Sequence, residues 1–220
     1  MSGRGVIFDL DGVLVMSEFL WEEGWTSFAA GHGYAWTPDD TRACQGMSVQ
    51  EWGAYLAGRA GAEPRYAADS VVAYVAGAYD SGRVSLLPGA EKMVAEVARR
   101  VPIALASSAP RTIIDTVMGT MGLGRYFRVT VSSAEVGAGK PAPDVYAEAA
   151  RKLGIDPRAS FAVEDSSNGV RSAAAAGLTV LAIEHERYPL AEDAVALAVA
   201  VCHSLDQVLD QLTALLEVDP

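Results

Sequence analysis

Cysteine and basic residues are scarce in this chain of 220 residues. The 2 cysteines, Cys44 and Cys202, are too few for a disulfide framework or a zinc cluster, so we expect a reducing compartment. The chain has 17 Lys+Arg against 28 Asp+Glu, which gives a formal net charge of −11. Because a negative chain repels polyanions, we expect no nucleic-acid partner.

Long apolar runs are also missing. The longest, residues 71–79 and 194–202, fall well short of the roughly 18 residues that a membrane-spanning helix needs. The apolar run at residues 6–8 ends at Asp9 and is too short for a secretory signal. No fixed-period repeat or low-complexity tract is present. We therefore expect a cytoplasmic protein with no membrane partner.

Short apolar runs alternate with segments of helical spacing. The runs at residues 6–8, 103–106, 128–131, 161–163 and 179–183 are typical of strands covered on both faces. Apolar residues recur at helical spacing over residues 93–101, 113–121 and 145–153, and Gly154 follows the last of these as a stop signal. The alternation predicts an α/β fold, with a Rossmann-like parallel sheet flanked by helices.

Residues 17–82 break this alternation, because they show helical spacing and no convincing strand. We predict an all-helical cap domain over residues 17–82, inserted into an α/β core domain of residues 1–16 and 83–220. All four tryptophans, Trp21, Trp25, Trp36 and Trp52, lie in the insertion, and their spacing favours packing in its core. A C-terminal helix over residues 205–215 either closes the core or forms a dimer contact, so a monomer and a homodimer both stay open.

Polar residues gather where the predicted strands end. They comprise Asp9 and Asp11, Ser107 and Ser108, Lys140, and Glu164 and Asp165. Ligands of an open parallel sheet bind beyond the carboxyl ends of its strands, so these groups share one crevice. Several carboxylates in one crevice repel each other unless a cation lies between them, and oxygen-only ligands favour Mg²⁺. A lysine and serine hydroxyls beside that ion fit a further anion, and phosphate is the natural candidate.

Four segments carry a resemblance to a known family. They are FDLDGVLVMSE from Phe8, ALASSAP from Ala104, GAGKPAPDVY from Gly137 and VEDSSNGVRSAAAAG from Val163. In this order they resemble the four motifs of the haloacid dehalogenase-like hydrolase superfamily. The similarity is closest to its sugar phosphatases and β-phosphoglucomutase-like members with a helical cap.

The resemblance implies roles for the crevice residues. Asp9 is the expected nucleophile, which forms an aspartyl phosphate, and Asp11 is the expected general acid and base. Ser107 and Lys140 are expected to hold the phosphoryl oxygens, with Ser108 as the second hydroxyl of the pair. Mg²⁺ is expected between the Asp9 carboxylate, the Asp11 backbone carbonyl and Asp165. Glu164 is then expected in the inner shell of the metal or one water away.

The presence of Asp11 favours phosphoryl transfer over dehalogenation, because a halide leaving group needs no proton. Mutases of this family carry an arginine in the cap that grips a second phosphate, and a histidine soon after the first motif. Here the comparable stretch, residues 45–49, reads QGMSV, and the comparable position after the first motif is Trp21. We therefore expect a phosphatase of a small phosphorylated metabolite, with a sugar phosphate as the leading candidate.

Two alternatives to a phosphatase remain. One is a phosphosugar mutase in which Arg42, Arg59 or Arg65 grips the second phosphate. The other is a non-catalytic protein that binds a phosphorylated metabolite on the same scaffold. Met16 stands where relatives commonly have aspartate, which puts closure of the cap in doubt more than the chemistry. The histidines, His32, His185 and His203, lie outside the motifs and are expected to be structural or exposed.

Overall fold

The computed structural model describes residues 3–217. The ends of the predicted core domain, residues 1–2 and 218–220, lie outside the described residues. Among the helices of the described part, none has the length and hydropathy needed to cross a membrane.

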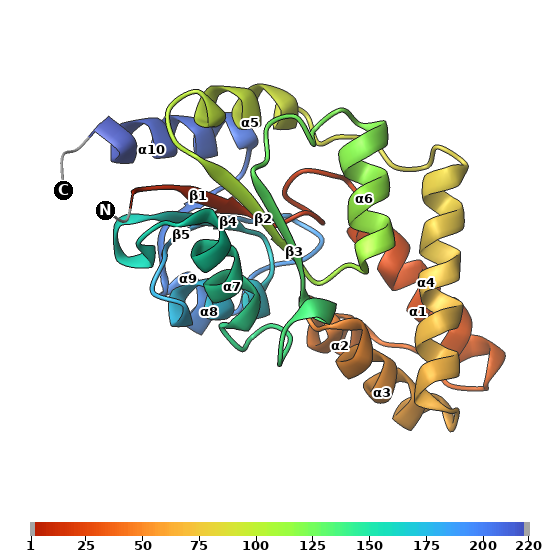
Figure 1. The fold of residues 1–220 in the computed structure, drawn as a ribbon. Helices are drawn as coiled ribbons and strands as arrows, with labels where there is room; N and C mark the ends of the chain where they lie inside the picture. The colour runs from red at the N-terminus through yellow and green to blue at the C-terminus, as the bar shows by residue number, and fades with distance from the viewer. Residues whose placement is uncertain (1–2, 218–220) are drawn as a thin grey trace.

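A parallel sheet of six strands forms the centre of the molecule (Figure 1). The strands are β1 (Val6–Phe8), β2 (Ile103–Ser107), β3 (Val129–Ser132), β4 (Phe161–Glu164), β5 (Thr179–Ile183) and β6 (Ala198–Cys202). Their order is β3-β2-β1-β4-β5-β6, and every neighbouring pair is parallel. The predicted α/β fold is confirmed, and the five predicted strands are present with bounds that shift by at most one residue.

Strand β6 was not predicted. Its alternating alanines and valines suit a helix and a strand equally, so the apolar pattern does not decide between them. Strand β6 is also an edge strand, and Val199 on it is exposed. It therefore lacks the continuous burial that marks β1, β2 and β4.

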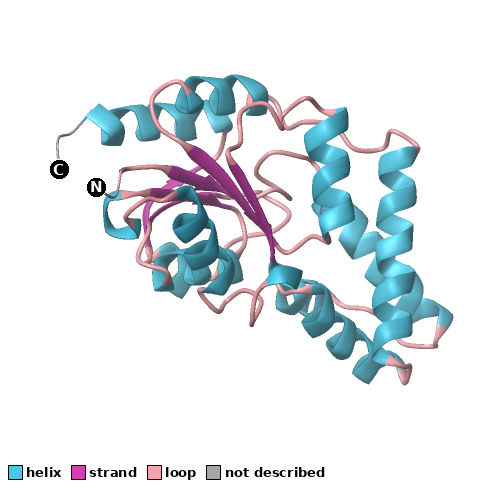
Figure 2. Ribbon diagram, viewed as in Figure 1, coloured by secondary structure: helices cyan, strands magenta, loops and turns pink. Residues whose placement is uncertain are grey.

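Helices cover both faces of the sheet, as Figure 2 shows. Three of them, α5 (Ala90–Ala98), α6 (Arg111–Thr120) and α10 (Leu205–Glu217), share one hydrophobic cluster with Val6 and Phe8 of β1. The other cluster contains Ile7 together with α7 (Asp144–Leu153) and α8 (Ser167–Ala175), and α9 (Glu192–Val195) adds Ala194 to it. Alternate residues of β1 thus face opposite layers, as the pleat of a strand requires. Two short 3-10 helices, η1 (Ser133–Glu135) and η2 (Pro157–Ala159), stand before and after α7 in the chain.

Four helices stand between β1 and α5. They are α1 (Glu18–Gly31), α2 (Pro38–Cys44), α3 (Val49–Ala60) and α4 (Pro64–Asp80), called here the helical insertion. The insertion lies beside the sheet, on the right in Figures 1 and 2. The two connections to it run together, because Val15 bridges Leu86 and the Met16 amide donates to the Ser85 carbonyl oxygen at 3.0 Å.

The tryptophans form the centre of the insertion, as predicted. Trp21, Trp25 and Trp52 are buried, and their ring centroids lie 5.8–6.5 Å apart. Trp36 is half-buried, with its ring 6.0 Å from that of Trp25. Ring contacts of this kind stabilise a core beyond the burial of area alone.

Candidate active site

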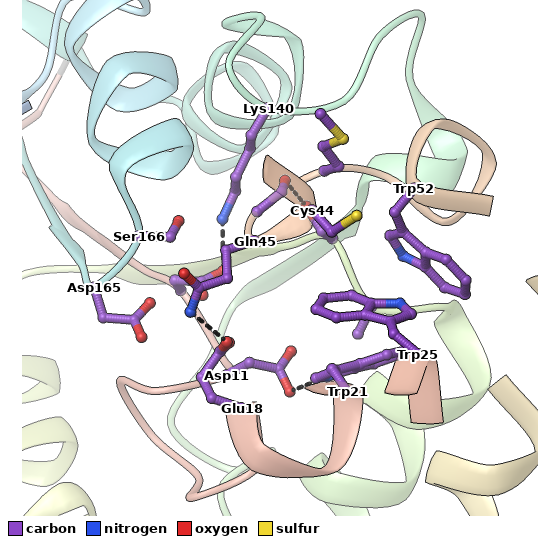
Figure 3. Close-up of a pocket in the computed structure, with 15 residues that line it drawn as sticks. Asp11, Glu18, Trp21, Trp25, Cys44, Gln45, Trp52, Lys140, Asp165 and Ser166 are labelled. Atoms are coloured by element: carbon purple, nitrogen blue, oxygen red, sulfur yellow. Dashed lines mark hydrogen bonds and ion pairs between the residues drawn. The ribbon is translucent and has the colours of Figure 1, made fainter. Parts of the chain in front are cut away.

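A pocket opens between the carboxyl ends of the strands and the helical insertion (Figure 3). Its lining divides into two groups. The core wall consists of Asp9, Asp11, Ser108, Ala109, Lys140, Asp165 and Ser166. The insertion wall consists of Glu18, Trp21, Trp25, Cys44, Gln45, Gly46, Met47 and Trp52. Figure 3 shows Lys140 and Asp165 on one side of the pocket and Trp52 on the other, with Gln45 and Glu18 between them.

Asp9 and Lys140 form a buried ion pair on the core wall. Asp9 follows β1, and its Oδ1 accepts a hydrogen bond from Lys140 Nζ at 2.6 Å. Burial raises the pKa of Asp9 well above its ordinary value, against the opposing charge of Lys140. Burial alone would lower the pKa of Lys140, but the charges of Asp9 and Glu164 outweigh it and raise that pKa. The ammonium group therefore stays charged beside Asp9.

Glu164, the last residue of β4, has a fully occupied carboxylate. Its Oε1 accepts from Lys140 Nζ at 2.5 Å and from the Tyr146 hydroxyl at 2.8 Å. Its Oε2 accepts from the Asp165 amide at 3.0 Å and from the amide and hydroxyl of Ser166 at 3.1 Å. A Cβ at Gly169 of α8 would overlap this carboxylate, so the glycine allows the helix to approach. Five donors thus fix Glu164 in place.

Asp165, the next residue, is the opposite case. Both of its carboxylate oxygens are buried and accept no hydrogen bond from residues 3–217. Burial, Glu18, Glu164 and Asp9 all raise the pKa of Asp165 well above its ordinary value. Ligand oxygens of Asp9, Glu164 and Asp165 lie within 4.8 Å of one another. Because a buried carboxylate needs a partner, this arrangement fits a divalent cation bound by oxygen ligands.

Asp11 is held by two donors from the start of the helical insertion. Its Oδ1 accepts from the Ser17 hydroxyl at 2.5 Å and from Trp21 Nε1 at 3.0 Å. Burial raises the pKa of Asp11, while these two hydrogen bonds oppose the rise. Gly12, at a φ of +71°, continues the turn, and a Cβ there would overlap the Asp165 carboxylate. The turn thereby brings Asp11 and Asp165 to one pocket.

The two predicted serines occupy different places. Ser107 ends β2 and is fully buried, and its Oγ accepts from the Ala109 amide at 3.0 Å. Ser108 lines the pocket, and its hydroxyl donates to the Gly46 carbonyl oxygen of the insertion at 2.6 Å. Asn168 Nδ2 makes a second such contact with the Gln45 carbonyl oxygen at 2.8 Å. The loop between α2 and α3 is therefore hydrogen-bonded to the core at both residues.

The insertion wall carries three indole rings and one carboxyl group, Glu18. Gln45 Nε2 donates to Glu18 Oε2 at 3.1 Å. Burial and the charge of Asp11 raise the pKa of Glu18 to about 7. Within the described part of the chain, the indole Nε1 of Trp25 is buried without a hydrogen-bond partner.

The structure brings six of the seven predicted crevice residues to the pocket or into contact with its lining residues. The seventh, Ser107, precedes Ser108 in the chain and is fully buried outside the lining. Glu18, Ser17 and the role of Tyr146 as a donor were not predicted from the sequence. Tyr146 lies in the quoted segment GAGKPAPDVY, and Glu18 directly follows Ser17 in FDLDGVLVMSE, so position in the motif was the available signal.

The histidines differ from one another. His32 is exposed and stacks on Phe28, with ring centroids 4.3 Å apart. His185 lies closer to the site than predicted, because its Nε2 is 2.6 Å from the Gly12 carbonyl oxygen and 3.9 Å from Asp165 Oδ2. His203 is exposed.

Comparisons with known proteins agree with this geometry. A family model described as haloacid dehalogenase-like hydrolase matches residues 4–177. Validoxylamine A 7'-phosphate phosphatase of Streptomyces hygroscopicus subsp. limoneus is 29% identical over 190 residues, which cover 84% of this chain and 89% of that protein. Hexitol phosphatase A of Escherichia coli (strain K12) is 31% identical over 186 residues, which cover 83% and 84%. The crystal structure of β-phosphoglucomutase from Clostridium difficile has the same fold, with a TM-score of 0.84, 20% identity and 97% of each chain covered.

Proposed function

Because this chain belongs to the haloacid dehalogenase-like hydrolase family, we propose that it is a Mg²⁺-dependent phosphatase of a small sugar phosphate. One observation carries the proposal. Asp9, held by Lys140, lies in the same buried cluster as Asp165, whose carboxylate accepts no hydrogen bond from the described residues. The names of the relatives, a validoxylamine phosphate phosphatase and a hexitol phosphatase, support the substrate class.

Asp9 and Asp165 are the side chains proposed to hold Mg²⁺, together with the Asp11 backbone carbonyl. Glu164 would act from outside this set, because its oxygens are already taken by five donors. When bound, the metal ion would neutralise phosphoryl oxygens and the repulsion between the carboxylates.

Asp9 is the proposed nucleophile. Its carboxylate oxygen would attack phosphorus, forming an O–P bond while the bond between phosphorus and the leaving oxygen breaks. Water would then attack phosphorus and release phosphate, which regenerates the Asp9 carboxylate. Lys140 holds Asp9 Oδ1 at 2.6 Å, so the attacking group is oriented before the substrate arrives. Lys140 and Ser107 are also proposed to bind the phosphoryl oxygens.

Asp11 is the proposed general acid and base. It would protonate the leaving alkoxide and then take a proton from the attacking water. Ser17 and Trp21 both donate to Oδ1, which leaves Oδ2 to exchange the proton. A raised pKa suits this role, because the carboxyl group then keeps its proton closer to neutral pH.

Hydrolysis is favoured over a mutase reaction by the charge of the pocket. Within residues 3–217, Lys140 is the one cation in the lining, and Asp9 and Glu164 already pair with it. A mutase must also hold a second phosphate. Arg59 and Arg65, two of the arginines considered for that task, pair instead with Asp40 and Asp69 outside the pocket.

Residues 17–82 are proposed to act as a cap domain that opens and closes over the core. The paired strand segments at Val15 and Leu86 form the connection about which it would move. The hydrogen bonds from Ser108 to Gly46 and from Asn168 to Gln45 would close it.

A phosphate-release assay tests the proposal. The protein is incubated with p-nitrophenyl phosphate and with glucose 1-phosphate, with Mg²⁺ and then with EDTA. We expect metal-dependent phosphate release and free glucose, and no release by the Asp9→Asn variant. Glucose 6-phosphate as the main product would indicate a mutase, and release equal to that of the variant would favour a non-catalytic binding protein.

A further inference from the structure

The insertion wall points to the chemistry of the leaving group, an inference that rests on the phosphatase activity proposed above. We propose that the substrate carries a single phosphate. Its leaving group is an uncharged or positively charged alcohol that packs an apolar face on Trp25 and Trp52 and donates a hydrogen bond to Glu18. A leaving group with a carboxylate or a second phosphate is excluded.

The charge of the pocket disfavours a second anion on the substrate. Among residues 3–217, Asp9, Asp11, Glu18 and Asp165 line the pocket together with one cationic side chain, Lys140, and the proposed Mg²⁺ would be held on the core wall by Asp9 and Asp165. Lys140 lies on the core wall and is held by Asp9 and Glu164, so it is not free to turn toward the insertion wall. Above its pKa of about 7 the Glu18 carboxyl group is ionised, and a second anion on the leaving group would then meet it in a buried site, where like charges repel strongly.

The arginines of the neighbouring cavity are both in ion pairs. This cavity adjoins the pocket at Gln45, Asp165 and Ser166 and contains two guanidinium groups, those of Arg42 and Arg171. Arg171 is paired with both oxygens of Asp193 at 2.7 Å, and Arg42 is paired with Asp39. Each guanidinium group therefore has a carboxylate partner, with which a second phosphate would have to compete.

The aromatic side chains offer an apolar surface to the leaving group. Trp25 and Trp52 line the pocket with their ring centroids 5.8 Å apart, and Met47 lies on the same wall. A sugar or cyclitol ring presents C–H groups to such a surface, and an ammonium group is attracted to it. Both kinds of leaving group also carry an N–H or O–H donor.

Glu18 supplies the acceptor for that donor. Gln45 donates to Glu18 Oε2, which orients the carboxyl group at the boundary between the two walls (Figure 3). The remaining oxygen, Oε1, is then the acceptor proposed to meet the leaving group. An alcohol with an apolar face and one donor can thus pack on the indole rings and donate to Glu18 at the same time.

Four hexose derivatives of similar size test the inference in the wild-type protein. They are glucose 6-phosphate, glucosamine 6-phosphate, 6-phosphogluconate and fructose 1,6-bisphosphate. We expect kcat/KM for the first two to exceed that for the last two by about 100-fold, the size of effect that buried like charges produce. The ratio between the first two distinguishes a hydroxyl from an ammonium donor. Equal kcat/KM for all four would overturn the inference.

Glu18→Gln sharpens the test. The variant should reduce the ratio of kcat/KM between neutral and anionic substrates by about tenfold. The glutamine side chain would keep a hydrogen-bond acceptor, while the repulsion between the carboxylate and an anionic leaving group is removed. Glu23→Gln is the matched control on the same helix. Glu23 is outside the pocket and pairs with Arg83, so this variant should leave the ratio unchanged. An unchanged ratio in Glu18→Gln would contradict the assignment of Glu18.

The outcome also separates this inference from the proposed function. If p-nitrophenyl phosphate and all four hexose derivatives release no phosphate, the phosphatase proposal itself is wrong. If phosphate is released but anionic leaving groups are accepted equally, only the account of the insertion wall is wrong. Trp52→Leu tests the packing of the leaving group on the indole rings. This variant should have a lower kcat/KM for glucose 6-phosphate, while circular dichroism shows that the protein is folded.

Discussion

The core wall and the insertion wall face the same pocket but are built from different chemistry. On the core wall, Asp9 and Lys140 form an ion pair, and Lys140 also pairs with Glu164, at the ends of β1 and β4 and in the loop before α7. On the insertion wall, indole rings pack on one another beside a single carboxyl group. Under the function proposed above, the core wall performs the reaction and the insertion wall selects the substrate.

The largest expected effect on activity comes from a substitution in the core wall alone. Asp9→Asn should lower kcat by about four orders of magnitude or more for every phosphate ester, because the nucleophile is lost. Phosphate release from p-nitrophenyl phosphate and from glucose 6-phosphate measures it. Asp69→Asn, an exposed position on α4, is the matched control and should keep full activity. Substrate-dependent losses in Asp9→Asn would count against the division between the walls.

Removal of the metal is the next effect. EDTA should lower activity by roughly 10³-fold, because phosphoryl charge is then left without its main neutralising group. Added Mg²⁺ should also raise the melting temperature of the wild-type protein, since it binds the folded state. Asp165→Asn should abolish that rise in calorimetry. A normal rise in this variant would place the metal elsewhere.

Asp11→Asn should separate proton transfer, the proposed role of Asp11, from bond formation at phosphorus, the proposed role of Asp9. We expect a loss of about 10²- to 10³-fold for sugar phosphates, whose alkoxides leave poorly without a proton. The loss for p-nitrophenyl phosphate should be less than about tenfold, because nitrophenolate needs little protonation. Steady-state kinetics with the two substrates gives the comparison. Equal losses would contradict the role of Asp11 as general acid.

Acid should loosen the helical insertion through Asp40. Burial alone would raise the pKa of Asp40, but hydrogen bonds from Thr37, Tyr55 and Tyr34 lower it to about 2. The folded-state pKa is below the unfolded value of about 3.9, so this stability is present above about pH 4 and is lost as pH falls toward 2. The expected loss is about 1 kcal/mol between pH 6 and pH 3, and about 2 kcal/mol by pH 2.

The tryptophans make this measurement specific, because all four lie in residues 17–82. Denaturant unfolding followed by tryptophan fluorescence at pH 6 and pH 3 therefore reports on the insertion. The Asp40→Asn variant should lose stability at pH 6 and show a weaker dependence on pH. The same pH dependence in both proteins would show that Asp40 is not the group responsible.

Ser108→Ala is expected to have the smallest effect. The Ser108 hydroxyl donates to the Gly46 carbonyl oxygen, so its loss should weaken closure of the insertion by about 1 kcal/mol, the net value of one hydrogen bond. We expect KM to rise about fivefold for all substrates, with kcat little changed. A loss of 100-fold or more in kcat would instead indicate direct phosphate binding by this side chain, as the sequence predicted.

The core was more predictable from sequence than the insertion wall for a physical reason. Buried parallel strands are continuous apolar runs, and their carboxyl ends must meet at one edge, so Asp9, Lys140 and Asp165 could be assigned to one crevice. The residues of the insertion wall come from α1, α3, the end of α2 and the loop that follows it. Helical spacing showed that Trp25 and Trp52 are buried but not that the same side chains reach a pocket.

The contrast between Glu164 and Asp165 was equally beyond the sequence. Both are acidic residues at the end of β4, yet one accepts five hydrogen bonds and the other accepts none from the described residues. The difference depends on Tyr146 of α7 and on the backbone turn into α8, which only the packed structure brings together.

Trapping the covalent intermediate tests the central claim most directly. The wild-type protein is mixed with Mg²⁺ and substrate, quenched in acid during turnover, digested and mapped by mass spectrometry. The account predicts one phosphoryl group on Asp9, absent from the Asp9→Asn variant. A phosphoryl group on another residue, or turnover with no modified peptide at any quench time, would contradict it.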